Sequence, residues 1–404
     1  MRQWSRYNPI GVEEKNAVSR VIDSGCLSSF IGGWGDDFHG GKEIKAFENE
    51  IASYFGTKYA ISFNSLTSGL IAAIGAIGIE PGDEVIVSPW TMSATATAII
   101  IWGGIPVFAD IEPKFYGLDP LSVMDKLTHK TKAIVVTDIF GHGAKLEELN
   151  DICKNYDLKM IEDVAQSPGI KYKEKYCGTW GDIGGFSLNY HKHIHTGEGG
   201  FCITDDEELC LKMKMIRNHA EVSVVNSPVK DLTNMVGFNF RMGEIEAAIG
   251  REQLKKLPML LEINQKKSRI VNSILCRETD FKIATIENNS SHAFYVLPIS
   301  LKGTSKQRSC WLDKLKDLGV PGLMKGYVNV HRLPMYEDKI AFGKNYPWCF
   351  SDNNQSYGLG VCPVSEKLQD QKFVGLLISM FDMNDEECRW IANTMVSVWQ
   401  DCKL

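Results

Sequence analysis

Apolar and polar positions along the first two-thirds of the chain form two recurring patterns. Apolar residues have helical spacing over residues 43–55, and Gly56 follows them as a helix terminator. Further helices are expected from Asn64–Ser65 through Ile79 and over residues 145–156. Strands are predicted for short apolar runs at residues 59–63 and in PGDEVIVSP, GIPVFADI, KAIVVTDIF and LKMIEDVA. This alternation predicts an α/β fold with a mostly parallel central sheet between helices.

The pattern changes after the segments DIGGFSLN and GGFCITD, which predict a strand pair flanking a polar loop. A helical pattern runs from Arg241 to about Cys276, and Pro258 predicts a kink or break in it. Beyond it lie the alternating run HAFYVLPI and helical patterns at residues 306–318 and 385–399, the latter with Asn384 as N-cap. We therefore predict a large domain over residues 1–255 and a smaller α/β domain over residues 256–404.

The uncharged stretch of residues 85–109 is long enough to resemble a membrane span, but prolines and glycines interrupt it. It is better interpreted as strand, turn, short buried helix and strand. The N-terminus lacks the pattern of a signal peptide. The eleven cysteines are scattered, with no CxxC spacing, which favours reduced thiols. We expect a soluble cytoplasmic protein without a membrane partner.

Charge narrows the function further. The chain has 44 basic and 50 acidic residues, a net charge of −6, and no extended basic block. This composition argues against a nucleic-acid partner. An anionic ligand would have to be bound by a local site.

The most informative segment is GDIGGFSLNYHKHIHTGEGG, residues 181–200, which places Lys192 in a loop before several glycines. A lysine in a loop is usually solvated. Alternatively, a partly desolvated amine could form a Schiff base with a carbonyl, and nearby glycines would let a cofactor approach the backbone. A third hypothesis is zinc binding, because on a strand His191, His193 and His195 would face one side. The following GEGG disfavours that strand, and we expect no metal site.

Three more segments carry candidate chemistry. The strand of MIEDVAQSPG ends at Asp163, where α/β sheets bind ligands; the residue could also be a simple N-cap. Beside a Schiff-base lysine, this carboxylate could pair with the pyridine nitrogen of pyridoxal phosphate (PLP). NSLTSGL, residues 64–70, could bind a phosphate at a helix N-terminus or merely cap the helix. Trp90 could stack on a flat ring or belong to the core.

In their order and spacing, these segments resemble the DegT/StrS-type sugar aminotransferases over essentially the whole chain. That family is PLP-dependent and has the aspartate aminotransferase fold, fold type I. FSLNYHKHIHTGEGG is similar to the family pattern FSF-x-x-x-K-x(4)-G-[DE]-G-G, which implies Lys192 as the Schiff-base lysine. EDVAQS resembles ED-x-A-[QH], which implies Asp163 at the pyridinium nitrogen and Gln166 near the ring hydroxyl.

The remaining motifs imply the other cofactor contacts. NSLTSGL resembles S-x-T-[AS]-[AG]-L, which implies Thr67 and Ser68 at the phosphate, together with Ser187. SPWTMSATATAI resembles a family segment in which the aromatic residue, here Trp90, stacks on the ring. VGFNFRMGEIEAAIG resembles the segment whose asparagine, here Asn239, reaches the phosphate in the neighbouring subunit. The resemblance therefore implies a homodimer with shared active sites.

The resemblance implies transfer of an amino group from glutamate or glutamine to a keto sugar, with a nucleotide-linked keto-deoxysugar as the expected substrate. Two departures are Leu66, where a small residue is common, and the unusual spacer Asn189–His191. The family also contains 3-dehydratases with histidine in place of the lysine. A keto-cyclitol aminotransferase, a sugar dehydratase and a non-catalytic binding or regulatory protein therefore stay open as alternatives.

Overall fold

A seven-stranded sheet forms the centre of the large domain. The computed structural model describes residues 3–223, 229–351 and 355–403. The strand order is β1–β9–β8–β5–β4–β2–β3, and six strands run parallel while β9 is antiparallel to both its neighbours. These strands are β1 (Tyr59–Phe63), β2 (Glu84–Val87), β3 (Ile105–Phe108), β4 (Thr131–Thr137), β5 (Lys159–Asp163), β8 (Ile183–Ser187) and β9 (Gly200–Thr204). The predicted mostly parallel sheet is confirmed.

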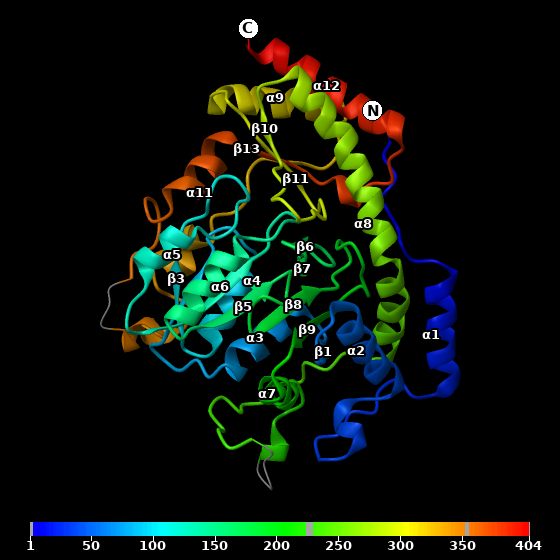
Figure 1. Ribbon diagram of the computed structural model, residues 1–404, viewed down its shortest axis with the longest axis vertical. Helices are drawn as coiled ribbons and strands as arrows, with labels where there is room; N and C mark the ends of the chain where they lie inside the picture. Colours follow the sequence, from blue (N-terminus) through cyan, green and yellow to red (C-terminus); the bar gives the residue numbers. More distant parts are fainter. Residues whose placement is uncertain (1–2, 224–228, 352–354, 404) are drawn as a thin grey trace.

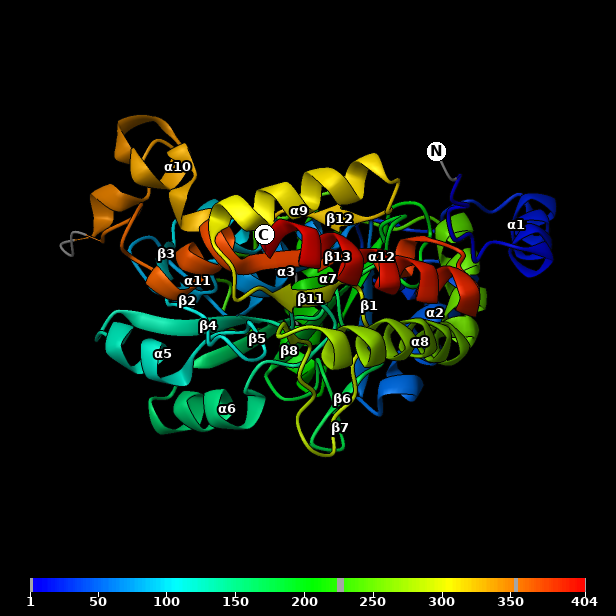
Figure 2. The ribbon, with the colours of Figure 1, turned by 90° about the horizontal axis from the view of Figure 1, so that it is seen from above.

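Helices cover both faces of this sheet (Figures 1 and 2). One face packs against α2 (Lys42–Phe55), α5 (Pro120–Lys126), α6 (Leu146–Asn155) and the first half of α8 (Glu244–Glu278). The other packs against α3 (Leu66–Ala76), α4 (Ser93–Ile101) and α7 (Glu207–Arg217). Because both faces are covered, β2, β3 and β4 contain the uninterrupted apolar runs VIV, IPVF and AIVV instead of alternating apolar and polar residues.

The helix α8 is 35 residues long and extends from the large sheet to a second, smaller unit. We predicted a kink or break at Pro258, but the helix continues through it. A proline removes one backbone hydrogen bond, and here the buried neighbours Leu257, Leu260 and Leu261 hold the helix against the core. Position 255 lies inside this helix, and the domain boundary there stays a prediction.

The smaller unit contains a four-stranded antiparallel sheet of order β10–β11–β13–β12. Its strands are β10 (Lys282–Ile283), β11 (Leu297–Ser300), β12 (Leu323–Met324) and β13 (Phe373–Leu376). The helices α9 (Ser305–Asp317) and α12 (Asp385–Lys403) share its hydrophobic core. Asn384 caps α12 as predicted, because its Oδ1 accepts a 3.0 Å hydrogen bond from the Glu387 N–H.

Shorter elements complete the chain. They are α1 (Val12–Ser24), α10 (Pro334–Glu337), α11 (Pro363–Lys367) and the hairpin of β6 (Lys171–Tyr172) and β7 (Lys175–Tyr176). Single turns of 3₁₀ helix lie at Asp36–His39, Glu221–Ser223, Val330–Arg332, Gly343–Asn345, Trp348–Phe350 and Ile378–Met380, and a π turn lies at Leu368–Lys372. The N-terminal segment reaches the small unit, where the Tyr7 N–H donates to the Met380 carbonyl.

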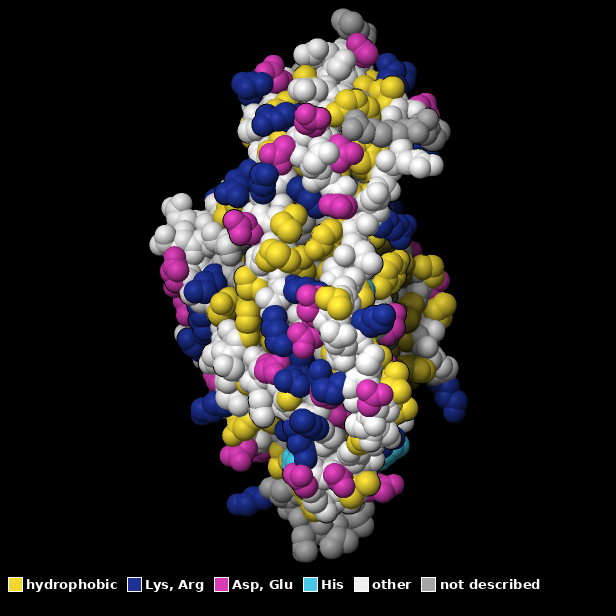
Figure 3. Space-filling model, turned by 90° about the vertical axis from the view of Figure 1, so that its right-hand side faces the viewer, with side chains coloured by type: hydrophobic (Ala, Val, Ile, Leu, Met, Phe, Trp, Pro, Cys, Tyr) yellow, Lys and Arg dark blue, Asp and Glu magenta, His cyan; other side chains and the backbone are white. Residues whose placement is uncertain are grey.

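The surface carries both signs of charge. On the face shown in Figure 3, basic and acidic side chains are intermingled, with small apolar patches between them. This face therefore has no single-sign field. Within the described residues, every helix is too short or too polar to cross a membrane.

Candidate active site

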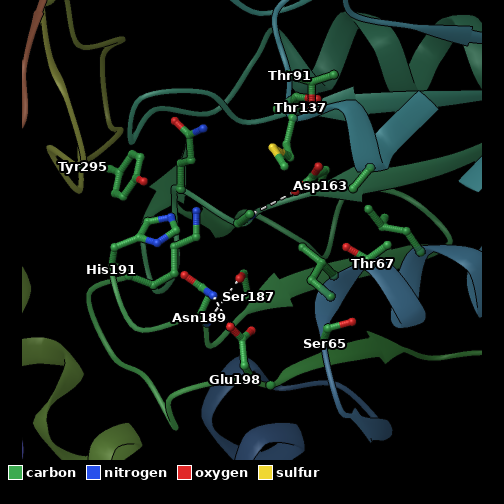
Figure 4. Close-up of a pocket in the computed structure, with 18 of the residues that line it drawn as sticks. Ser65, Thr67, Thr91, Thr137, Asp163, Ser187, Asn189, His191, Glu198 and Tyr295 are labelled. Carbon is green, nitrogen blue, oxygen red and sulfur yellow. Dashed lines mark hydrogen bonds between the residues drawn. The ribbon is translucent and has the colours of Figure 1, made fainter. Parts of the chain in front are cut away.

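A cavity of about 240 Å³ lies where β4 and β5 end and α3 begins. Open α/β sheets bind ligands at this edge, the carboxyl ends of their strands. Figure 4 shows Asp163 and Thr67 on one side of the cavity and His191 and Tyr295 on the other. The lining residues are Ser65, Leu66, Thr67, Leu70, Thr91, Met92, Ala94, Thr137, Asp163, Ala165, Gln166, Ser187, Asn189, His191, Lys192, Glu198, Gly199, Tyr295 and Tyr327.

Asp163 is the buried carboxylate of this cavity. It ends β5, and two donors hold it: the Thr95 hydroxyl bonds Oδ2 at 2.7 Å, and the Ala165 N–H bonds Oδ1 at 3.1 Å. Burial raises the pKa of Asp163, while these hydrogen bonds and the charge of Lys192 oppose the rise. Bringing a cation to this carboxylate would favour its charged form.

Lys192 presents its amine to the same cavity. Its Nζ lies 4.6 Å from the centre of the Tyr295 ring, a cation–π distance. Burial lowers the pKa of Lys192 to about 8, against the opposing effect of Asp163. Roughly a tenth of the amine is therefore neutral at pH 7, several hundred times more than for a free lysine. A neutral amine is the form that attacks a carbonyl.

The N-terminus of α3 forms the floor of the cavity. Ser65 is its N-cap, and its hydroxyl oxygen accepts a 3.1 Å hydrogen bond from the Ser68 N–H. The N–H groups of Leu66 and Thr67 belong to the first turn, where a helix offers free donors to an anion. A Cβ at Gly200 would lie 2.4 Å from the Leu66 nitrogen, so only glycine lets β9 approach this turn so closely.

Gln166 and Thr137 border the opposite wall. The Gln166 side chain is fixed between the two units, because Oε1 accepts from the Phe140 N–H at 2.8 Å and Nε2 donates to the Tyr327 hydroxyl at 3.1 Å. The buried Thr137 hydroxyl and the Oδ1 of Asn189 have no hydrogen-bond partner among the described residues. Unpaired buried polar atoms in a cavity indicate a site for a polar ligand.

Ser187 lines the cavity at the end of β8, and its hydroxyl accepts a 3.3 Å hydrogen bond from the Asn189 N–H. Asn189 in turn donates from Nδ2 to Glu198 at 2.8 Å. The structure thus gathers five predicted residues in one cavity: Lys192, Asp163, Gln166, Thr67 and Ser187. Their individual roles stay predictions.

Trp90, for which we predicted a stacking role, is not among the residues that line the cavity, and the role stays a prediction. It is fully buried in an aromatic cluster between the two units, 5.0 Å from the Phe373 ring centre. Its indole N–H donates a 2.7 Å hydrogen bond to Asn329, which fixes the ring away from the cavity. The next two residues, Thr91 and Met92, line the cavity in its place.

Two further predicted phosphate contacts also lie outside the lining. Ser68 is buried in α3, where its hydroxyl donates to Asn64 Oδ1 at 2.6 Å. This hydrogen bond joins the first turn of the helix to the segment before it. Asn239 is exposed, and its Oδ1 accepts a 2.9 Å hydrogen bond from Arg241 Nε. This contact leaves the Asn239 amide group as a donor on the surface, as a contact with another subunit would require.

The three alternating histidines do not form the strand that the zinc hypothesis needs. Residues 190–194 are turn and bend, residues 195–196 have no regular structure, and His191 is the histidine of the three that lines the cavity. His193 is buried with Nε2 2.9 Å from the Ala293 carbonyl, while Nδ1 of His195 accepts from the Gly197 N–H. Among the residues described, no cluster of three or more His, Cys, Asp or Glu side chains is suited to a metal ion.

Sequence reasoning missed several residues of the site. Tyr295 and Tyr327 come from the small unit and line the cavity, and Figure 4 shows Tyr295 across the cavity from Asp163. Neither stands in a motif, so the sequence held no signal for them beyond an aromatic residue in an apolar run. Thr95 lies in SPWTMSATATAI, where its contact with Asp163 could have been suspected only from the fold.

Comparisons with known proteins agree on one family. The model of the DegT/DnrJ/EryC1/StrS aminotransferase family matches residues 13–356. GDP-perosamine synthase of Escherichia coli O157:H7 is 33% identical over 334 residues, which cover 81% of this chain and 85% of that protein. The spore coat polysaccharide biosynthesis protein SpsC of Bacillus subtilis is 31% identical over 341 residues, covering 82% and 85%. The crystal structure of an aminotransferase from Psychrobacter cryohalolentis superposes with a TM-score of 0.82 at 26% identity and covers both chains completely.

The fold and the lysine–aspartate cavity define the class as a PLP-dependent transferase of fold type I. The chain belongs to the DegT/DnrJ/EryC1/StrS aminotransferase family and is a PLP-dependent transaminase. Its cavity fits this cofactor, because it combines an amine, a buried carboxylate, a free helix N-terminus and the unpaired Thr137 hydroxyl.

Proposed function

We propose that this enzyme transfers an amino group from glutamate or glutamine to the ketone of a nucleotide-linked keto-deoxysugar. The observation that carries the proposal is the shared cavity of the Lys192 amine and the buried Asp163 carboxylate, beside a helix N-terminus that can bind phosphate. The relatives named above include a nucleotide-sugar enzyme by its name, GDP-perosamine synthase.

When bound, PLP supplies an aldehyde carbon for amine exchange and a ring that accepts electrons. In this proposal, the N-terminal turn of α3 and Ser187 hold the phosphate. Lys192 attaches the cofactor and, once released, carries the proton between the amino donor and the cofactor. Its lowered pKa suits this task, because an amine that titrates near 8 can both accept and return a proton at neutral pH.

Asp163 would face the pyridine nitrogen and favour its protonated state. Thr95 and the Ala165 N–H leave the carboxylate ordered before any cofactor binds, because each engages a different oxygen. Such preorganisation reduces the reorganisation that catalysis would otherwise require. Gln166, anchored between Phe140 and Tyr327, would lie by the ring hydroxyl.

A second hollow beside the cavity favours a substrate sugar that carries no charge near the reacting carbon. This hollow, the apolar annex, holds about 370 Å³ and shares Thr91, Met92 and Tyr327 with the cavity. The annex is lined by Thr91, Met92, Ser93, Met324, Gly326, Tyr327, Val328, Val330 and Leu333, none of them charged. A phosphate on the sugar ring would find no cation among these lining residues. A deoxysugar presents a methyl group instead.

The homodimer is part of the same proposal. Asn239 is exposed and does not line the cavity of its own chain, and Val236, close to it in sequence, is an exposed apolar side chain. A partner subunit that covers them would receive the Asn239 amide at its own phosphate site. We also retain the prediction of a cytoplasmic enzyme, in keeping with eleven free cysteines.

Spectroscopy of the purified holoenzyme tests this function. Adding glutamate or glutamine alone should bleach the visible band of the bound cofactor, and a nucleotide-linked keto-deoxysugar should restore it. Asp163→Asn should keep the fold and the cofactor but slow bleaching severely, because the carboxylate charge is lost. Lys192→Ala should bind PLP without turnover.

The same assay separates the alternatives. A protein that never bleaches with any amino donor would be a binding protein and would contradict the proposal. Bleaching followed by recovery only with a keto-cyclitol would show that the amino acceptor is a keto-cyclitol and not a nucleotide-linked sugar. Loss of a sugar hydroxyl without amine transfer would indicate a dehydratase, a class that shares this fold: a GDP-4-keto-6-deoxymannose-3-dehydratase superposes with a TM-score of 0.79 at 22% identity.

A further inference from the structure

Two cysteines in the small unit are in direct contact, although they are 92 positions apart in sequence. Cys310 lies in α9 and Cys402 in the last turn of α12, and their sulfur atoms are 3.0 Å apart. Among the described cysteines, no other two sulfurs are recorded in contact. The pair is therefore a consequence of how these two helices pack.

The surroundings hold the pair in place. The Trp311 indole N–H donates a 2.9 Å hydrogen bond to the Met395 carbonyl, which ties α9 to α12. The rings of Trp311 and Trp399 meet edge to face at 5.8 Å, and Phe281 packs on both. This packing fixes α9 against α12 and brings the two thiols close together.

Neither cysteine of the pair belongs to the fully buried core. Cys310 and Cys402 are half-buried, whereas six of the other cysteines are fully buried: Cys153, Cys177, Cys202, Cys210, Cys362 and Cys388. Neither member lines the cavity or the annex, so neither serves the reaction described above. The pair is only partly buried, is already in contact and lies outside the active site. Packing in the core therefore does not account for it, as it does for a buried thiol.

We propose that Cys310 and Cys402 form a reversible disulfide that links α9 to α12 when the protein meets a low-molecular-weight disulfide such as that of glutathione. One thiol loses its proton and attacks the oxidant, which releases one small thiol and leaves a mixed disulfide. The second cysteine then attacks the protein sulfur of that mixed disulfide, and the other small thiol leaves. In total two protons and two electrons pass to the oxidant, which becomes two thiols.

The chemistry predicts that the first attack on the oxidant is slow and that the Cys310–Cys402 disulfide then forms quickly. Burial and the neighbouring Cys310 raise the pKa of Cys402 to about 11, so little thiolate is present at neutral pH. Once one sulfur is modified, its partner is already in contact with it. The mixed disulfide should therefore not accumulate.

Closing this loop should stabilise the folded protein, since it restricts the unfolded chain between residues 310 and 402. We expect the melting temperature of the oxidised holoenzyme to rise by roughly 3–5 °C. The linked helices include the C-terminal helix, which otherwise ends the chain on the surface of the small unit (Figure 1).

The experiment treats the holoenzyme with oxidised glutathione and measures its mass, its free thiols and a non-reducing peptide map. The expected result is a loss of 2 Da per link, with peptides of residues 310 and 402 joined. Cys310→Ser and Cys402→Ser should each prevent the link, and Cys276→Ser, at an exposed cysteine of α8, is the matched control that should retain it. Dithiothreitol should reverse both the link and the thermal shift.

The wild-type map decides the matter even if a serine variant folds poorly. A link between other cysteines, or stable glutathione adducts on Cys310 or Cys402 without closure, would overturn the proposal. Bleaching by glutamate, recorded in parallel, shows whether the protein stays folded and keeps its cofactor.

Discussion

The hydroxyl of Thr95 donates a 2.7 Å hydrogen bond to Oδ2 of Asp163, which joins the first turn of α4 to the end of β5. Thr95 has one hydroxyl proton, so its 2.7 Å contact with Thr91 must be a hydrogen bond donated by Thr91. The result is a short relay from the cavity wall to the carboxylate. Hydrogen bonds in such a chain strengthen one another in a buried site.

The first prediction concerns this relay. Thr95→Val preserves the side-chain shape but removes the donor, so the rise in the pKa of Asp163 caused by burial loses an opposing contact. We expect the rate of cofactor bleaching by glutamate to fall about tenfold to a hundredfold, with little change in the KM for glutamate. Stopped-flow absorbance measures it. Thr95→Ser, which keeps the hydroxyl, should retain most of the rate; equal losses in both variants would mean that packing, and not the hydrogen bond, is at stake.

The second prediction follows from the pKa of Lys192, which burial lowers to about 8. Only the neutral amine attacks the aldehyde of free PLP. The rate at which apoenzyme captures PLP should therefore rise with pH and level off above about 8, instead of rising up to the ordinary lysine range near 10.5. The visible band reports capture directly. A rate that still climbs steeply between pH 9 and 10 would show that the amine is not desolvated as described.

The sequence predicted the large sheet and the position of most candidate residues because their signals are local. Asp163 ends an apolar strand, and Lys192 stands in a glycine-flanked loop, so short segments were enough. The position of Trp90 outside the cavity lining was not predicted, because the residue is held by a hydrogen bond to Asn329, 239 positions away. Contacts of that range leave no mark in a short segment.

Contacts of the small unit were likewise not predictable from short segments of sequence. Tyr327 enters the cavity from the loop after β12, and no spacing in the sequence relates it to Gln166, which it contacts. The continuity of α8 through Pro258 was also not predictable from local rules. A proline favours a break, but the buried leucines around it favour one continuous helix against the core, and the packing prevails.

The third prediction concerns a pair of buried acids next to the site. Burial raises the pKa of Glu162 to about 7, although three backbone N–H groups bond it, and burial together with Glu162 raises the pKa of Asp138 well above its ordinary value. A folded-state pKa above the unfolded value means that the contribution to stability is full at low pH and is lost as pH rises through the folded value. This pair should therefore destabilise the fold as pH rises from about 4 to beyond 7.

Asp138→Asn tests this sign. Its Oδ1 accepts a 2.9 Å hydrogen bond from the Ala144 N–H, which asparagine can keep, and its carboxyl group is also hydrogen-bonded to the Cys177 thiol. We expect the variant holoenzyme to melt at a higher temperature than the wild type at pH 8, with the difference shrinking toward pH 5. Thermal unfolding at both pH values measures it. A difference that grows toward low pH would mean that Asp138 is ionised in the folded protein.

The last prediction tests the shared active site. Lys192 lies in the cavity of its own chain, whereas Asn239 lies outside it with its amide free at the surface. If that amide completes the phosphate site of a partner subunit, Asn239→Ala should weaken PLP retention, and Lys192→Ala should abolish turnover. Mixed dimers of the two variants then contain one site with both defects and one site with neither. The mixture should regain activity at limiting PLP, measured as release of 2-oxoglutarate with glutamate and a nucleotide-linked keto-deoxysugar. The matched control mixes Lys192→Ala with Asp163→Asn; both defects fall on residues of the same chain's cavity, so each hybrid site keeps one of them and activity should not return. Absence of complementation by Asn239→Ala, in dimers shown to exchange subunits, would place Asn239 outside the partner's site.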